Sequence, residues 1–134
     1  MAEEGFRRCF GDDTEVVFDF HGYPAAIHQL LHGRPRPDRF HVRGYIEEGT
    51  TTTPFDLLIA NQVTRYHLAA EALRRLPDRV RHSIGRTVNT DHTDAGADID
   101  ALADDYERRI MASREEILRT GTDPETIREW RWTG

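Results

Sequence analysis

The sequence predicts an α/β domain, because strand-like runs alternate with helix-like segments along its 134 residues. Two runs are rich in β-branched and aromatic residues, and glycine and proline separate them from the neighbouring helical patterns. A long amphipathic pattern near the carboxyl end is the third observation. We therefore expect one domain over residues 1–134, with few strands, several helices and a long C-terminal helix.

The first forty residues alternate between the two kinds of pattern. Phe6 and Phe10 lie four apart and Gly11 follows them, which predicts a short helix over residues 2–10 with a glycine cap. The compact apolar run at residues 15–20 then predicts a buried strand. A helix and a strand at the start of the chain are typical of a fold in which helices cover a sheet.

A second helix and a second strand follow. Pro24 stands at the first position of a helix expected over residues 25–32, and Gly33 ends that helix. Two prolines forbid its continuation, and alternating apolar residues predict a second strand over residues 40–45. Two strands alone leave unpaired edges and seldom cover a core, so the sheet looks incomplete.

The middle of the chain predicts one helix or two abutting helices over residues 55–76. Thr53 is placed as an N-cap and Pro54 occupies the first helical position. Apolar residues recur at three- to five-residue steps, and Asn61 and Thr64 mark a break in the pattern.

The last third predicts a loop, a long helix and a docked tail. Residues 83–97 are rich in glycine, threonine, asparagine and aspartate, which indicates an exposed loop. Apolar residues then recur every three or four positions over residues 99–117 and stop before Gly121. Trp130 and Trp132 carry large apolar areas, so we expect the carboxyl end to dock onto the domain.

Composition excludes several classes of protein. The net charge is −6, from 18 basic and 24 acidic residues that are interspersed, which argues against binding to nucleic acid or to an anionic membrane. The sequence has neither a long apolar run nor a secretory signal, so we expect a cytoplasmic protein without a membrane span. Cys9 alone cannot form an internal disulfide. Every basic residue is arginine, which excludes lysine Schiff-base chemistry and a P-loop lysine in this chain.

Histidine spacing raises the possibility of a metal site. His28 and His32 lie four apart on a predicted helix, and His21 or His41 could supply a third nitrogen. With seven histidines in the chain, this spacing also arises by chance, and no acidic residue stands between the pair to act as a base. We therefore assign no metal site, and we interpret Cys9 as a structural thiol.

A polar segment before the middle helix holds the candidate binding residues. A Gly-Thr-rich loop that leads into a capped helix offers backbone amides and hydroxyls to a phosphate or carboxylate. Arginine can add a bidentate clamp, and a pair of glutamates offers a general acid or base. The alternative is that the threonines only cap the helix and the glutamates are solvated. The tentative ligand or domain-contact residues are Arg43, Gly49, Thr50, Thr51, Thr52 and Thr53, and the acid/base candidates are Glu47 and Glu48.

Several segments together resemble the C-terminal end of the phosphoketolases. The residues that carry the resemblance are Val17 to Pro24, Ile27-His28, His41 to Tyr45, and Glu47 to Asp56, the last of which reads Glu-Glu-Gly-Thr-Thr-Thr-Thr-Pro-Phe-Asp. The tail from Asp123 to Trp130 is similar as well. The specific part of the resemblance spans about residues 15–77, and residues 83–97 look like an insertion.

The resemblance implies a fold and an activity. Phosphoketolases are thiamine-diphosphate-dependent aldehyde-lyases of carbohydrate metabolism. They split xylulose 5-phosphate or fructose 6-phosphate with inorganic phosphate into acetyl phosphate and an aldose phosphate, and magnesium holds the diphosphate. Their C-terminal domain resembles that of transketolase, a Rossmann-like three-layer domain, and this chain would be an incomplete copy of it. The domains that hold the cofactor and catalyse the reaction have no counterpart here.

Two functions follow as alternatives. In the first, the chain is the C-terminal part of a phosphoketolase, holds no cofactor, is inactive alone and needs the remaining domains or subunit as its partner. In the second, it is a free-standing anion- or sugar-phosphate-binding or regulatory module without catalysis. Uncovered strand edges also predict self-association of the isolated chain.

Overall fold

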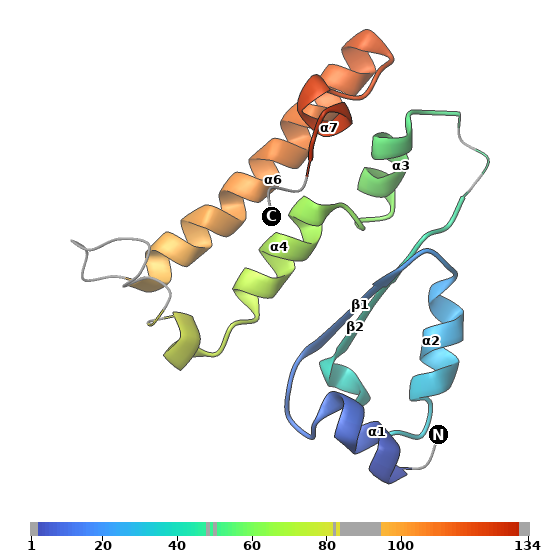
Figure 1. Cartoon of the computed structure of the whole chain (residues 1–134), viewed down its shortest axis with the longest axis vertical. Coiled ribbons are helices and arrows are strands. Elements are labelled where there is room, and N and C mark those ends of the chain that lie inside the picture. Colours follow the sequence, from blue (N-terminus) through green and yellow to red (C-terminus); the bar gives the residue numbers. More distant parts are fainter. Residues whose placement is uncertain (1–2, 48, 50, 82, 84–94, 132–134) are drawn as a thin grey trace. The chain divides into compact units, whose positions relative to one another are not determined.

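A computed structural model describes residues 3–47, 49, 51–81, 83 and 95–131. The chain divides into two compact units, Met1–Glu48 and Gly49–Gly134, and each is described by itself (Figure 1). The prediction that the whole chain forms one domain stays a prediction.

The first unit is built on two parallel strands. Its elements are α1 (Glu3–Phe10), β1 (Val16–Phe20), α2 (Pro24–Leu31), a 3-10 turn (Pro37–Arg39) and β2 (Phe40–Gly44). The register pairs Val16 with Phe40 and continues to Phe20 with Gly44. The strands and the two α-helices of this unit are confirmed with each boundary within one residue of expectation, and the structure adds that α2 connects parallel strands as a helix crossover.

The two faces of this sheet differ in chemistry. One face carries the apolar core of the unit, in which Phe6, Leu31 and Phe40 are buried. Partly buried hydrophobic residues packed against them are Phe10, Val16, Phe18, Ile27 and Val42. The opposite face presents Asp19 beside Arg43 in register, because side chains alternate along a strand. One face is therefore aromatic and the other polar.

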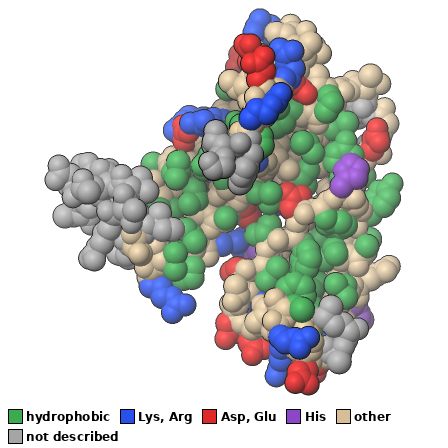
Figure 2. Space-filling view, in the orientation of Figure 1, with side chains coloured by type: hydrophobic (Ala, Val, Ile, Leu, Met, Phe, Trp, Pro, Cys, Tyr) green, Lys and Arg blue, Asp and Glu red, His purple; other side chains and the backbone are tan. Residues whose placement is uncertain are grey.

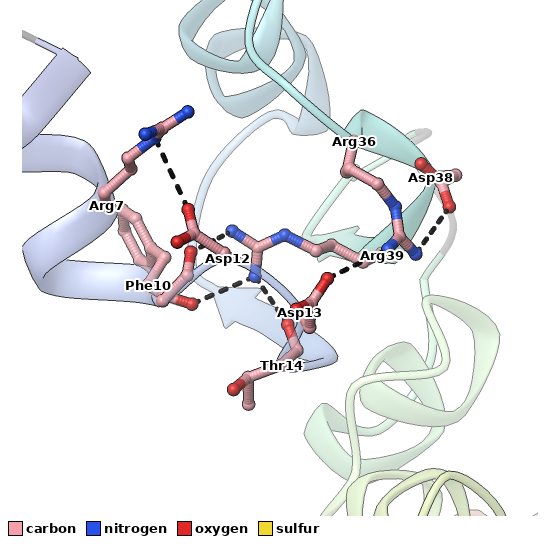
Figure 3. Close-up of polar contacts among 9 residues, drawn as sticks. Arg7, Phe10, Asp12, Asp13, Thr14, Arg36, Asp38 and Arg39 are labelled. Carbon is pink, nitrogen blue, oxygen red and sulfur yellow. Dashed lines mark hydrogen bonds and ion pairs between the residues drawn. The ribbon is translucent and has the colours of Figure 1, made fainter.

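A buried guanidinium joins α1 to the start of β1 (Figure 3). Arg39 is only 2% exposed and donates to the carbonyl oxygens of Phe10 at 2.9 Å, Gly11 at 2.8 Å and Thr14 at 2.5 Å. Its guanidinium also lies 4.3 Å from the ring centroid of Phe40. The cation thus satisfies carbonyls at the end of α1, where the helix dipole is negative.

The second unit is helical. Its helices include α3 (Pro54–Ala60), α4 (Arg65–Arg74), α6 (Ala95–Thr120) and α7 (Glu125–Arg128), and residues 78–81 are helical as well. Thr53 caps α3 and Thr64 caps α4, each through a side-chain oxygen that accepts a backbone N–H at 3.2 Å. The sequence allowed either one helix or two abutting helices over residues 55–76, and the structure shows two.

An apolar cluster holds α3 against α6. Its buried members are Phe55, Ile59, Ile110 and Ile117, and Leu58, Tyr66 and Ile127 pack against it. Helices α4 and α6 lie side by side (Figure 1), and Arg74 of α4 forms ion pairs with Asp104 and Glu107 of α6. Among the described residues, no helix is both long and apolar enough to cross a membrane.

The α/β fold class and the long C-terminal helix are confirmed. Most of the loop predicted over residues 83–97 lies outside the described residues. Its last part is wrong, because residues 95–97 belong to α6, where two alanines favour helix. The docking of the tail is confirmed only in part. Ile127 packs on the core, whereas Trp130 stays 46% exposed and contacts the guanidinium of Arg65, which lies 4.9 Å from the Trp130 ring and 4.8 Å from that of Tyr66. Trp132 lies outside the described residues.

Candidate functional site

The first cluster of sequence-motif residues lies where the two strands end. His21 follows β1, Tyr45 follows β2, and their rings stack with centroids 4.5 Å apart. Gly22 accepts a hydrogen bond at 3.0 Å from the Tyr45 N–H. At Gly44 a Cβ atom would lie 2.2 Å from the Gly22 oxygen, so only glycine fits there. We call His21, Gly22, Gly44 and Tyr45 the strand-end cluster.

The polar face of the sheet leads into this cluster. Asp19 lies beside Arg43, and partial burial raises the pKa of its carboxyl above the ordinary value, with the charge of Arg43 opposing the shift. His41 and Glu15 are joined at 2.5 Å. Parallel sheets bind ligands at the carboxyl ends of their strands, so this edge is the natural place for a contact in the first unit.

The second cluster lies at the start of α3. Thr52 donates to the carboxylate of Asp56 at 2.7 Å, and Arg114 of α6 forms an ion pair with the same carboxylate at 3.5 Å. The backbone N–H of Phe55 donates to both oxygens of Asp123, at 3.3 and 3.4 Å. We call Thr52, Thr53, Asp56, Arg114 and Asp123 the helix-start cluster.

The amides of this helix start are already engaged. Phe55 donates to Asp123, the Asp56 N–H donates to Thr53, and the Leu57 N–H donates to the Thr53 carbonyl at 3.1 Å. The carboxylate of Asp123 therefore uses the Phe55 amide, one of the backbone donors at the start of α3.

The predicted site residues divide between the two units. Arg43 is part of β2 and Glu47 is exposed, whereas Gly49, Thr51, Thr52 and Thr53 precede α3. Gly49 has a φ of +74°, a conformation that favours glycine. Thr50 and Glu48 lie outside the described residues. The ligand-binding and acid/base roles of these residues stay predictions.

The four histidines of the metal hypothesis lie within the described residues. His21, His28 and His32 are exposed, and His41 is bonded to Glu15. Over the described residues, no three His, Cys, Asp or Glu side chains are grouped so that they could hold a metal ion.

Comparison with known proteins decides the family. A family model described as the XFP C-terminal domain matches residues 1–132. The chain belongs to this family. The match extends well beyond the 15–77 segment in which the resemblance is most specific, and it includes residues 83–97.

Relatives of this family member carry phosphoketolase names. A probable phosphoketolase of Brucella abortus is 38% identical over 133 residues, which is 99% of this chain and 15% of that protein. Probable phosphoketolase 2 of Rhizobium meliloti is 36% identical over 132 residues, and a probable phosphoketolase of Chlorobaculum tepidum is 35% identical over 133 residues. The chain spans about 15% of the length of these curated relatives.

The sequence analysis did not predict some residues of the two clusters as part of a site. Asp123 accepts a hydrogen bond from a residue 68 positions away, and no local pattern carries that information. A signal did exist, because the tail at Asp123 and the segment ending at Asp56 both resemble the same family. The structure brings these two segments together within the second unit.

Proposed function

We propose that the chain is the C-terminal part of a phosphoketolase that splits xylulose 5-phosphate or fructose 6-phosphate with inorganic phosphate. The family match over residues 1–132 carries this proposal, together with relatives that are named probable phosphoketolases and are several times longer. The activity belongs to the whole protein, and this segment supplies structure to it.

In this proposal the magnesium and the thiamine diphosphate are held outside this segment. A magnesium site uses several oxygen ligands, and over the described ranges no three His, Cys, Asp or Glu side chains are grouped around a metal position, which supports the proposal. The acids at the start of α3 are engaged by Arg114 and by the α3 amides. We therefore place the cofactor on other parts of the protein and derive no step through it.

The proposed role of the segment is to complete the enzyme's carboxyl end. A two-stranded parallel sheet with a single apolar face rarely stands alone, since parallel sheets are normally covered on both faces. The polar face with Asp19 and Arg43, and the strand-end cluster beyond it, are the surfaces we assign to the remaining domains or subunit.

A segment exchange tests this function. The matching segment of the Brucella abortus relative is deleted, or replaced by this chain, and acetyl phosphate formation is measured with either sugar phosphate, phosphate, thiamine diphosphate and magnesium. We expect the deletion to abolish activity and the exchange to restore it. Full activity of the deleted protein would overturn the structural role, and acetyl phosphate formed by the isolated chain would overturn the placement of catalysis elsewhere.

A further inference from the structure

The basic side chains of this chain are all of one chemical kind. Each of the 18 is a guanidinium, and no side chain in the sequence carries a primary amine. At two positions the contacts require that group. Arg39 is buried and donates to three carbonyl oxygens, and Arg65 lies against the rings of both Tyr66 and Trp130. A lysine ammonium can neither fork in this way nor stack as a plane on a ring.

Other arginines lie where a lysine would serve as well. The side chains of Arg36, Arg74 and Arg109 are 53%, 44% and 59% exposed, and each forms an ion pair with an acidic side chain. Exposed pairs of this kind contribute little to stability, whichever cation forms them. The contacts therefore explain the choice of arginine at the buried and stacked positions, but they do not explain it at the exposed ones.

The product of the proposed reaction distinguishes the two cations. This inference rests on the proposed function, in which the enzyme forms acetyl phosphate, a mixed anhydride. When an unprotonated amine attacks its carbonyl carbon, a C–N bond forms and the bond from that carbon to the bridging oxygen breaks. Phosphate leaves with the electron pair, and the amine loses a proton. Acetylation removes the charge of a lysine, whereas a guanidinium stays protonated and offers no such nucleophile at neutral pH.

We propose that the guanidinium-only set makes this segment resistant to acetylation by the enzyme's own product, so that its ion pairs persist where acetyl phosphate is formed. The pairs that join separate elements carry the consequence. Arg74 of α4 holds both Asp104 and Glu107 of α6. Acetylation of a lysine at this position would take the cation away from both carboxylates.

The test treats the purified 134-residue chain with acetyl phosphate. Hydroxylamine then removes labile acetyl groups from thiols such as the exposed Cys9 and from imidazoles, mass spectrometry counts the stable ones, and thermal unfolding is measured. In Arg74→Lys we expect one additional acetyl group and a fall of about 2–4 °C in the unfolding temperature, because the cross-helix charge is lost. The wild type should gain no acetyl group beyond its terminal amine and should keep its unfolding temperature.

Two matched variants control for the loss of charge and for acetylation itself. Arg74→Gln is uncharged from the start, so it should unfold at the temperature of the treated Arg74→Lys and should not respond to acetyl phosphate. Arg79→Lys, at an exposed site of the same unit, should gain the acetyl group without the fall in unfolding temperature. If Arg74→Lys does not fold, Arg36→Lys, at a position that pairs with Asp13 in the first unit, takes its place.

Three outcomes would overturn the proposal. They are stable acetyl groups on side chains of the wild type, a fall in its unfolding temperature equal to that of Arg74→Lys, and an Arg74→Lys variant that is not acetylated or is equally stable afterwards. Because acetyl phosphate is added from outside, none of these outcomes depends on activity of the chain. Failure of the proposed function is recognised separately, by the segment exchange.

Discussion

The two units of the chain are stabilised in different ways. The first packs aromatic rings on one face of a parallel strand pair, with Phe6 at 4.9 Å from Phe10 and 5.5 Å from Phe40 between ring centroids. The second packs the stripe of a long helix on short helices and adds surface ion pairs such as Arg74 with Glu107. The first therefore depends on a few dense contacts between distant residues, and the second on many similar contacts along one helix.

The largest expected effect is on the aromatic core. Phe6→Ala should lower the free energy of unfolding of the first unit by about 4 kcal/mol, because it leaves a cavity among packed rings. Hydrogen exchange of peptides from β1 and from α6 measures each unit separately. Tyr23→Ala, at a site that is 67% exposed, is the control and should change little. Equal loss of protection in α6 would break the comparison by showing that the units unfold together.

The buried guanidinium should come next. Arg39→Met retains most of the side-chain volume but leaves three carbonyl oxygens without their donor, so we expect a loss of about 3 kcal/mol in the first unit. Urea unfolding, followed through the hydrogen exchange of the β2 amides, measures this loss of stability. Arg36→Met removes exposed ion pairs to Asp13 and Asp38 (Figure 3) and should lower stability by less than about 1 kcal/mol. Equal effects of the two substitutions would contradict the structural role of the buried cation.

The clasp at the start of α3 should contribute less. Asp123→Ala removes the acceptor of the Phe55 N–H, and we expect about 1–2 kcal/mol of destabilisation in the second unit. Thr53→Ala should cost about 1 kcal/mol as the loss of one cap. Thermal unfolding with and without inorganic phosphate measures both. Stabilisation of the wild type by phosphate, lost in a Thr52→Ala and Thr53→Ala double variant, would favour the anion-binding alternative over a clasp.

The same contrast explains what could be predicted from the sequence. Helix α6 was predictable because its apolar stripe repeats with a single period, and the Thr53 cap was predicted from local chemistry, whereas Thr64 was recognised only as a break in the pattern. The roles of Arg39 and Asp123 were not, because each depends on partners 25 or more positions away. Local patterns report which element forms, whereas the pairing of elements decides which polar groups end up buried.

The surface view makes the same point about charge. Acidic and basic side chains are interspersed on the face shown in Figure 2, as they are along the sequence. Composition could therefore predict this mixed surface, whereas it could not predict which charges pair across helices, such as Arg74 with Asp104 and Glu107.

The smallest expected effect concerns pH, and it has opposite signs in the two units. Partial burial raises the pKa of Asp19, so the first unit binds a proton more tightly than the unfolded chain and gains stability as the pH falls toward the ordinary value of 3.8. Arg74 lowers the pKa of Glu107, so the second unit loses stability as the pH falls below the ordinary value of 4.5.

Asp19→Asn should therefore stabilise the first unit at neutral pH and be without effect in acid. Glu107→Gln should destabilise the second unit at neutral pH and be without effect in acid. Exchange of β1 and α6 peptides between about pH 3 and pH 7, corrected for the intrinsic rate, measures both at once. If both substitutions destabilised their units at neutral pH, the comparison would fail. The polar face of the sheet would then stabilise the charged Asp19 carboxylate, as Arg74 stabilises the charged Glu107 carboxylate on α6.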